Sequence, residues 1–368
     1  MPPNYHVLGL MSGTSLDGLD LAYCSFSKGE EGKWHYQILS ATTVSYSDAI
    51  KSKLKSLPYL SALELLKAHH WFGNMCGDEA TNFLHQHFAK VDFIASHGHT
   101  VFHHPADGYT LQIGSGANIH AKTGLPVVCD FRTVDVALGG QGAPLVPVGD
   151  KLLFHEYTFC LNLGGIANIS FEEINNRIAF DICPVNIVLN AFAEKFIPSL
   201  AYDANGDIAR SGVVIDSLLH VLNNLKYYEQ PYPKSLGKEW VDANIFPLLA
   251  SYNSHTIPDL LCTFCHHIAM QIASVTLAFC KRNSLQNASL LVTGGGAFNS
   301  FLLQLFQQYM GETIEIIIPD EQTISFKEAL IFAFLGVLRL ESENNSLASV
   351  TGASRDSIGG AVYGNLKK

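Results

Sequence analysis

The chain has 368 residues, of which 48% are apolar and 15% charged, and this composition is typical of a well-packed globular protein long enough for two domains. Its net charge of -10 argues against nucleic acid or an anionic membrane as the main partner, because both select basic faces. The first residues lack a basic stretch followed by a long apolar one, and later apolar runs are interrupted, so we expect a cytoplasmic protein that binds small molecules and does not enter a membrane.

Residues 6–26 predict a β-hairpin, because two apolar runs flank a turn of small and hydroxylated residues. Gly13 lets the chain approach a ligand closely, and exposed N–H and hydroxyl groups in such a turn suit a phosphate. The hairpin contains no Lys or Arg, and Asp17 and Asp20 would repel a bare polyphosphate. We therefore infer a divalent cation between carboxylate and phosphate. An ordinary hydroxyl-rich turn is the alternative.

The next segment predicts a strand at residues 34–39 and a helical region that opens near Ser47. Pro58 interrupts this region. Ser61, with Glu64 three residues later, forms a capping box that predicts the start of a second helix.

A buried strand begins near residue 91 and leads into polar residues that include His97 and His99. Open α/β sheets place ligands at the carboxyl ends of strands, so both histidines are candidate ligand contacts. Short strands at residues 109–113 and 126–129 follow, and the second leads to Arg132. The loop at residues 139–144 predicts either a hinge between domains or a plain connection, and its Gln141 can donate to and accept from a hydroxylated ligand.

Residues 159–170 repeat the pattern of the first hairpin, an apolar strand, a glycine turn and a second apolar strand. Two phosphate-binding hairpins, one in each domain, suggest a cleft that holds a nucleotide from both sides.

A strand then carries the chain into Asp181, and Pro184 ends it. An aspartate at a strand end that faces a nucleotide is a candidate general base. In the alternative interpretation Asp181 caps the helix at residues 187–196.

The remaining chain contains a polar, loop-rich stretch at residues 202–241 and a long apolar helix from residue 259 to about 280. This helix contains Cys262 and Cys265 followed by two histidines, a pattern shared with haem and zinc sites, but its apolar periodicity favours a buried helix. A strand at residues 290–293, three glycines and a helix at residues 299–310 form a phosphate or adenosine signature that close strand-to-helix packing explains equally well.

Near the end of the chain, Ser325 and Glu328 form a second capping box before an apolar helix at residues 329–338. We expect the Gly-rich tail after Ser349 to pack back on the first domain.

Several motifs together closely resemble the anhydro-N-acetylmuramic acid kinase family. The resemblance runs from about residue 6 to about residue 355, in the order of the family, and its most specific part is MSGTSLDG at residues 11–18. The others are SHGHTVFHHP, DFRTVDVALGGQGAPLVP, LNLGGIANIS, the group Asp181, Pro184 and Asn186, and VTGGGAFN.

The resemblance implies an α/β protein with two ribonuclease-H-like, actin-like ATPase domains around a central nucleotide cleft. The family uses ATP and water to open the 1,6-anhydro ring of anhydro-N-acetylmuramic acid and to phosphorylate O6, giving N-acetylmuramic acid 6-phosphate in cell-wall recycling. A homodimer is also implied. We place the N-terminal domain at residues 1–134 plus 342–368 and the C-terminal domain at residues 135–341.

The resemblance also assigns roles to residues of this chain. Asp181 becomes the catalytic base, with ATP and Mg²⁺ as the cofactors and Asp17 as a metal contact through water. The residues expected to bind ATP and its phosphates are Gly13, Thr14, Ser15, Leu16, Asp17, Gly18, Leu19, Asp20, Asn162, Gly164, Gly165, Asn168, Gly294, Gly295 and Gly296. The residues expected to contact the sugar are His97, His99, Arg132, Gln141 and Glu328.

The chain departs from the family pattern close to these residues. Where members usually have Asp-Thr-Gly-Pro, Ile182 and Cys183 stand after the aspartate. His99 replaces a usual glutamine and Asn190 a usual aspartate. A thiol beside the base would make turnover sensitive to oxidation.

Two other functions fit the same fold. One is a kinase that acts on a different amino sugar. The other is a nucleotide-gated binding protein without sugar chemistry, against which the lack of a peptide-binding domain argues.

Overall fold

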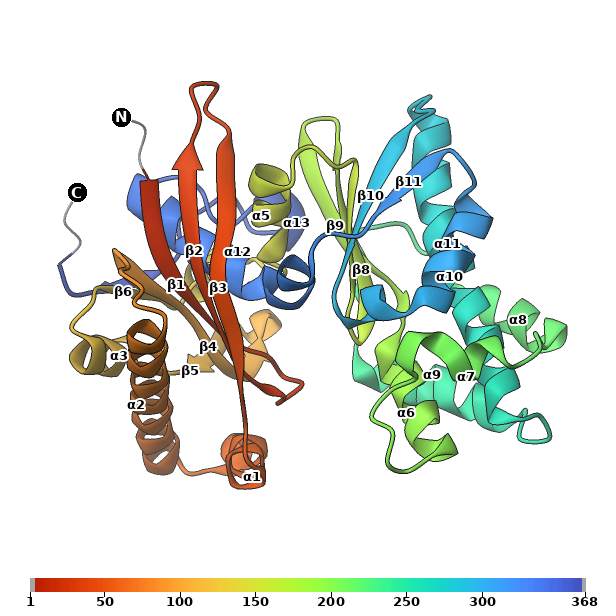
Figure 1. Cartoon of the computed structure of the whole chain (residues 1–368), viewed down its shortest axis with the longest axis horizontal. Coiled ribbons are helices and arrows are strands. Elements are labelled where there is room, and N and C mark those ends of the chain that lie inside the picture. The colour runs from red at the N-terminus through yellow and green to blue at the C-terminus, as the bar shows by residue number, and fades with distance from the viewer. Residues whose placement is uncertain (1–3, 366–368) are drawn as a thin grey trace. The chain divides into compact units, whose positions relative to one another are not determined.

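The computed structural model describes residues 4–365, which form two compact units (Figure 1). Unit 1 contains the described residues up to Phe154 and those from Phe326 onward, and unit 2 contains His155–Ser325. Each unit contains a mixed β-sheet and helices, so the predicted α/β class is confirmed.

The sheet of unit 1 has the strand order β12-β6-β4-β1-β2-β3, with β5 paired to β4. Strands β1 to β3 are antiparallel neighbours, whereas β4 runs parallel to both β1 and β6. The strands are β1 (Asn4–Ser12), β2 (Gly18–Lys28), β3 (Trp34–Ser45), β4 (Phe93–His104), β5 (Tyr109–Ile113), β6 (Val127–Cys129) and β12 (Ala361–Tyr363).

Helices cover both faces of this sheet. Leu8 of β1 belongs to the same buried cluster as Phe72 of α2, while Gly9, which points the other way, lies against Ala329 of α12. The predicted cap at Ser61 is present, since its hydroxyl group accepts the N–H of Glu64 at the start of α2, and Ser47 caps α1 in the same way by accepting the N–H of Ile50. The helices are α1 (Asp48–Ser56), α2 (Ala62–Gln86), α3 (Gly116–Thr123), α4 (Thr133–Ala137), α5 (Val146–Leu153), α12 (Glu321–Glu341), which starts in unit 2, and α13 (Ala348–Thr351).

The sheet of unit 2 has the order β11-β10-β7-β8-β9. Its strands β7 to β9 are antiparallel neighbours, and β10 runs parallel to β7 and β11. The strands are β7 (Phe159–Leu163), β8 (Ile166–Glu173), β9 (Asn176–Pro184), β10 (Ala288–Thr293) and β11 (Ile314–Ile317).

The long helix α10 crosses the core of unit 2. It is long and apolar enough to span a membrane by length and composition, but 67% of that apolar window is buried inside the protein, as expected for a core helix. The helices of unit 2 are α6 (Asn186–Phe196), α7 (Asp207–Arg210), α8 (Asp216–Asn223), α9 (Lys238–Ala250), α10 (Ile257–Arg282) and α11 (Ser300–Met310). Short 3₁₀ turns lie at Leu57–Tyr59 and Pro105–Asp107 in unit 1, and at Ala204–Gly206, Lys226–Glu229 and Gly295–Phe298 in unit 2.

The two sheets share one topology. In each, three antiparallel strands are followed by two parallel ones, the first of which pairs with the first strand of the unit. This is the ribonuclease-H-like arrangement expected of an actin-like ATPase, and it occurs once in each unit.

The compact units divide the chain at residues 154/155 and 325/326, whereas the sequence placed domain boundaries at 134/135 and 341/342. The two schemes differ over residues 135–154 and 326–341, which contact each other. Asp150 and Lys327 form a buried ion pair at 2.8 Å, and Gly149 lies against Ile331. The division of the chain into functional domains stays a prediction.

Three local predictions were wrong. Strand β4 continues through His97 and His99 to His104, because its residues from His99 onward pair with β5. Ser325 and Glu328 lie inside α12, which begins at Glu321, so they form no capping box at a helix start. The polar stretch at residues 202–241 is partly helical, since its apolar residues pack into the core of unit 2.

The contact between β1 and α12 leads to a stability prediction. A Cβ atom at Gly9 would overlap the carbonyl oxygen of Ala329 and lie 3.1 Å from the Cβ of Ala333. We expect Gly9→Ala to lower the free energy of unfolding by about 1–3 kcal/mol, measured by urea denaturation. Gly13→Ala is the control, since its Cβ would meet only Ser15 Oγ, at 3.4 Å, and N of Ser15, at 3.9 Å. Equal stability of the two variants would contradict this account of the packing.

Candidate functional site

The turn of the first hairpin in unit 1 stands on a buried hydrogen-bonded base. Ser12 is 1% exposed, and its Oγ accepts a bond of 2.8 Å from the hydroxyl of Tyr46 and lies 3.0 Å from Nδ1 of His99. Burial lowers the pKa of His99, which favours the neutral imidazole. Above this base, Thr14, Ser15 and Asp17 are exposed.

Two of the five predicted sugar contacts, His97 and Arg132, bond to each other in unit 1. The guanidinium of Arg132 donates to Nε2 of His97 at 3.0 and 2.9 Å and to the carbonyl of Gly142 at 2.6 Å. The loop after Arg132 carries the exposed Gln141. Glu328 is exposed at the protein surface, but the protein atoms packed around its carboxyl group raise its pKa, and the charge of Arg132 opposes this rise. His99 differs, because its contact is with Ser12.

A buried carboxylate fixes the loop that carries Gln141. Asp135 is 1% exposed, and it accepts bonds from the N–H of Gly142 at 2.7 Å and from the hydroxyl groups of Ser346 and Thr351 at 2.6 and 2.8 Å. The N–H of Gln141 also donates to the carbonyl of Thr351. The loop is thus held to the C-terminal part of unit 1.

In unit 2, the turn of the second hairpin contacts two other predicted segments. The carbonyl of Gly164 accepts a bond from the N–H of Asn186, and that of Gly165 accepts from Val185 and Ile187 at the start of α6. Gly294 has a φ of 79°, and a Cβ there would overlap Oδ1 of Asn162. The hairpin and the glycine turn of residues 294–296 therefore lie side by side. Only glycine fits at residue 294, because any side chain there would overlap the hairpin.

Asp181 lies within β9, where it pairs with Asn168 of β8. The pairing then skips Ile182, which forms a bulge, and such bulges redirect neighbouring side chains. Burial raises the pKa of Asp181, while the N–H of Leu236, which donates to its Oδ2 at 2.9 Å, lowers it. Asp181 does not cap α6, whose N-cap residue is Val185 without a side-chain bond.

The departures from the family pattern lie in different environments. Cys183 is fully buried, and burial raises the pKa of its thiol, which disfavours its oxidation; the sensitivity of turnover to oxidation at Cys183 stays a prediction. Ile182 is also buried, and Asn190 is half-buried on α6.

Two contacts of the site were missed from the sequence. Tyr46 carries no motif that marks it as a partner of Ser12. The donor to Asp181 is a backbone N–H, so the identity of Leu236 gave no signal.

The cysteine and histidine motif of α10 is part of the core. Cys262 and Cys265 are buried free thiols, His266 bonds to Tyr309, and His267 bonds to Tyr228 and Asn223. Within residues 4–365, no three His, Cys, Asp or Glu side chains gather as a metal site would require.

Comparison with known proteins gives matches along nearly the whole chain. A model of the family described as anhydro-N-acetylmuramic acid kinase matches residues 5–365. The anhydro-N-acetylmuramic acid kinase of Hydrogenovibrio crunogenus is 34% identical over 98% of this chain and 99% of its own length. The proteins of the same name from Saccharophagus degradans and Bacillus cereus are 33% and 31% identical, over 99% and 97% of this chain and 100% and 98% of their own lengths.

Solved structures give more distant matches. A ROK hexokinase from Thermus thermophilus is 12% identical, with a TM-score of 0.40 over 90% of this chain and 99% of that chain. An activator of 2-hydroxyisocaproyl-CoA dehydratase from Clostridium difficile is 14% identical, with a TM-score of 0.39 over 92% of this chain and 97% of its own.

The buried His267 leads to a prediction on stability and pH. Its side chain is fully buried and neutral, and burial lowers its pKa to about 3, against about 6.5 in an unfolded chain. A lowered pKa in the folded state contributes stability above pH 6.5 that is lost as the pH falls towards 3. We expect His267 to account for about 2 kcal/mol of lost stability between pH 7 and pH 5.

Urea unfolding of His267→Gln at both pH values tests this expectation. The glutamine amide can still bond to Tyr228 and Asn223, so the variant should fold, and its stability should depend less on pH than that of the parent protein. The same change at the exposed His255 is the control. An unchanged pH dependence in His267→Gln would refute the prediction.

Proposed function

This chain belongs to the anhydro-N-acetylmuramic acid kinase family, and we propose that it uses ATP and water to open the 1,6-anhydro ring of anhydro-N-acetylmuramic acid and to phosphorylate O6. The family match over residues 5–365 carries this proposal. The product is N-acetylmuramic acid 6-phosphate, an intermediate of peptidoglycan recycling, and the reaction takes place in the cytoplasm.

We assign phosphate binding to the two hairpin turns, residues 13–20 and 162–168. Each turn presents backbone N–H groups from a buried, hydrogen-bonded base, and such groups bind phosphate oxygens without a cationic side chain. The adenosine lies at residues 294–296, next to the second turn. These amides hold the triphosphate in line for transfer, which is most of what phosphoryl transfer requires of a protein.

Asp181 is the base in this proposal. In the anhydro sugar, O6 is tied to C1 and cannot attack phosphorus. The carboxylate removes a proton from water, the hydroxide attacks C1, and the freed O6 attacks the γ-phosphate. The raised pKa of Asp181 favours this role, because it makes the carboxylate a stronger base.

The side chains near the first turn fit Mg²⁺. This ion needs only one or two carboxylates in addition to phosphate oxygens and water, so a three-residue cage is not required. Asp17 is exposed at the end of the turn, and it would hold the ion through water. When bound, Mg²⁺ supplies neutralisation of the phosphate charge, which the hairpin cannot do because it lacks Lys and Arg.

We assign sugar binding to His97, Arg132, Gln141 and Glu328 of unit 1, with His99 acting through Ser12. His97 and Arg132 already bond to each other, so they can present a fixed surface to hydroxyl groups. The remaining parts of the proposal are a homodimer and the absence of nucleic acid and membrane partners, in keeping with the net charge of -10.

Replacement of the proposed base tests the mechanism. We expect Asp181→Asn to lower kcat by about a thousandfold and to change the Kd for ATP by less than about twofold. The amide oxygen of the variant can still accept the N–H of Leu236, so the local structure should persist. Steady-state kinetics and calorimetry measure the two effects, with Asp242→Asn on the exposed face of α9 as the control. Retained turnover would exclude Asp181 as the base.

Isotope labelling tests the coupling of hydrolysis to transfer. The protein is incubated with ATP, Mg²⁺ and anhydro-N-acetylmuramic acid in oxygen-18 water, and the sugar phosphate is analysed by mass spectrometry. We expect one labelled oxygen on C1 and none in the phosphate group, because water attacks carbon and O6 attacks phosphorus. Label in the sugar-bound phosphate, or an intact anhydro ring in the product, would refute the coupled reaction.

A further inference from the structure

We infer that residues 227–236 of unit 2 are a positioning element that fixes the proposed base Asp181 and leaves one carboxylate oxygen, Oδ1, to accept the proton from water. This inference rests on the proposed function, and it adds to it the residues that hold the base and the atom that takes the proton.

The 227–236 segment makes three hydrogen bonds to Asp181. The hydroxyl of Tyr227 donates to the carbonyl oxygen of Asp181 at 2.6 Å, and the N–H of Asp181 donates to the carbonyl of Lys234 at 3.1 Å. The N–H of Leu236 donates to Oδ2 of the carboxylate at 2.9 Å. One segment therefore holds both the backbone and the side chain of Asp181.

The position of β9 explains why this residue needs such a partner. β9 is the last strand of its sheet and has a neighbour, β8, on one side only. Polar backbone groups on the outer side of an edge strand require other partners. Next to the bulge at Ile182, the 227–236 segment provides them.

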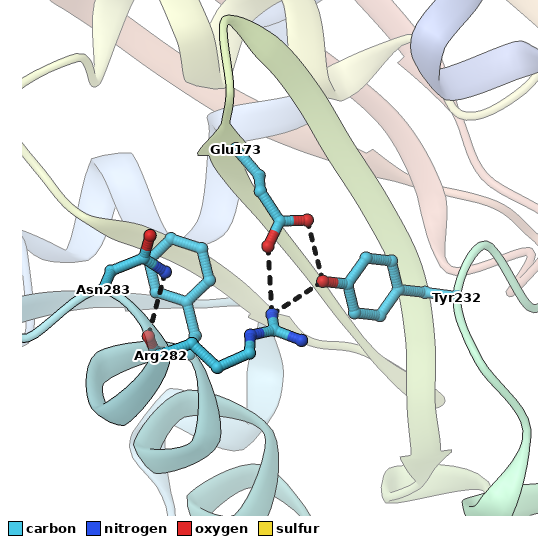
Figure 2. Close-up of polar contacts among 5 residues, drawn as sticks. Glu173, Tyr232, Arg282 and Asn283 are labelled. Carbon is cyan, nitrogen blue, oxygen red and sulfur yellow. Dashed lines mark hydrogen bonds and ion pairs between the residues drawn. The ribbon is translucent and has the colours of Figure 1, made fainter.

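The segment is itself anchored beside Asp181. Tyr232 stacks on Phe180, the residue before Asp181, with ring centroids 5.0 Å apart and an interplanar angle of 7°. Its hydroxyl donates to Glu173 at 2.8 Å, and Arg282 of α10 donates to both Glu173 and Tyr232 (Figure 2). Strand β8 and helix α10 thus hold the middle of the segment.

A second anchor lies within the segment. The Nζ of Lys234 donates to the carbonyl of Tyr227 at 3.0 Å and lies 4.5 Å from the centre of the Tyr227 ring. This contact joins the two ends of the segment that touch Asp181, so the donors at Tyr227 and Leu236 keep a fixed separation.

The two carboxylate oxygens of Asp181 have different roles in this arrangement. Oδ2 accepts the N–H of Leu236, whereas among the described residues no hydrogen bond engages Oδ1. An N–H donor stabilises the ionised carboxylate and so opposes the effect of burial on its pKa. Tyr227 and Cys183 interact electrostatically with Asp181, and burial raises the pKa of both, so they stay neutral near pH 7. Lys234 is a charged group of the segment, and its backbone carbonyl accepts the N–H of Asp181 while its charge acts on Cys183.

Removal of one backbone N–H tests the positioning role. Leu236→Pro eliminates the donor to Oδ2, whereas Leu236→Ala keeps it although it removes more of the side chain. The readout is the rate of a single turnover with ATP and anhydro-N-acetylmuramic acid as a function of pH. We expect the apparent pKa of the acid limb to rise by about one unit in Leu236→Pro and to stay unchanged in Leu236→Ala. A structural role alone would lower the rate without moving this pKa, and that result would overturn the inference.

A milder pair of variants serves if the proline variant does not fold. Tyr227→Phe removes the bond to the Asp181 carbonyl, and the control Tyr309→Phe removes a bond to His266 that lies outside the 227–236 segment and does not touch Asp181. We expect kcat to fall about tenfold only in Tyr227→Phe, with the KM values for ATP and sugar within about twofold of the parent in both. An equal kcat in the two variants would also overturn the inference.

Failure of this inference can be told apart from failure of the proposed function. If Asp181→Asn retains turnover, Asp181 is not the base, and the proposed mechanism fails first. If Asp181→Asn is inactive while Leu236→Pro and Tyr227→Phe match their controls, the base assignment stands and the positioning role is refuted.

Discussion

The parallel pairing of one strand with the first strand of each hairpin is the constraint on which the rest of the structure depends. β1 is hydrogen-bonded to β2 on one side and to β4 on the other, and β7 is bonded in the same way to β8 and β10. A strand with neighbours on both sides and helices over the sheet is buried on both faces, so most of its residues are apolar. The turn after such a strand lies at the edge of the sheet where the pairing with the parallel neighbour, β4 or β10, also ends. Polar residues of that neighbour therefore lie beside the turn.

The two units use this edge in different ways. In unit 1, the end of β1 pairs Ser12 with His99, and their side chains bond beneath the turn. In unit 2, the end of β7 pairs Asn162 with Thr293, and the next residue is Gly294, which has no side chain to separate the two turns. The first unit thus supports its turn with a buried polar network, and the second supports it by close backbone contact.

The sequence was a good guide where the interactions are local. Both hairpins, the cap at Ser61 and the long helix α10 follow from patterns within a few residues of each other. It was a poor guide where distant backbone decides. β4 continues past His97 because β5 pairs with it, and the donor to Asp181 comes from Leu236, 55 residues later in the chain. A backbone N–H belongs to every residue except proline, so no residue type marks it.

The loss of Thr and Gly after Asp181 fits this dependence on distant backbone. Both replacements, Ile182 and Cys183, are buried in the apolar core of unit 2, where they add packing and remove the flexibility of a glycine. Packing fixes the path of β9 but cannot orient a carboxylate, because apolar side chains offer no hydrogen bond. The orientation of Asp181 therefore falls to the bulge at Ile182 and to the donors in residues 227–236. A carboxylate held in this way tolerates changes beside it in the sequence more readily than changes in the segment that touches it.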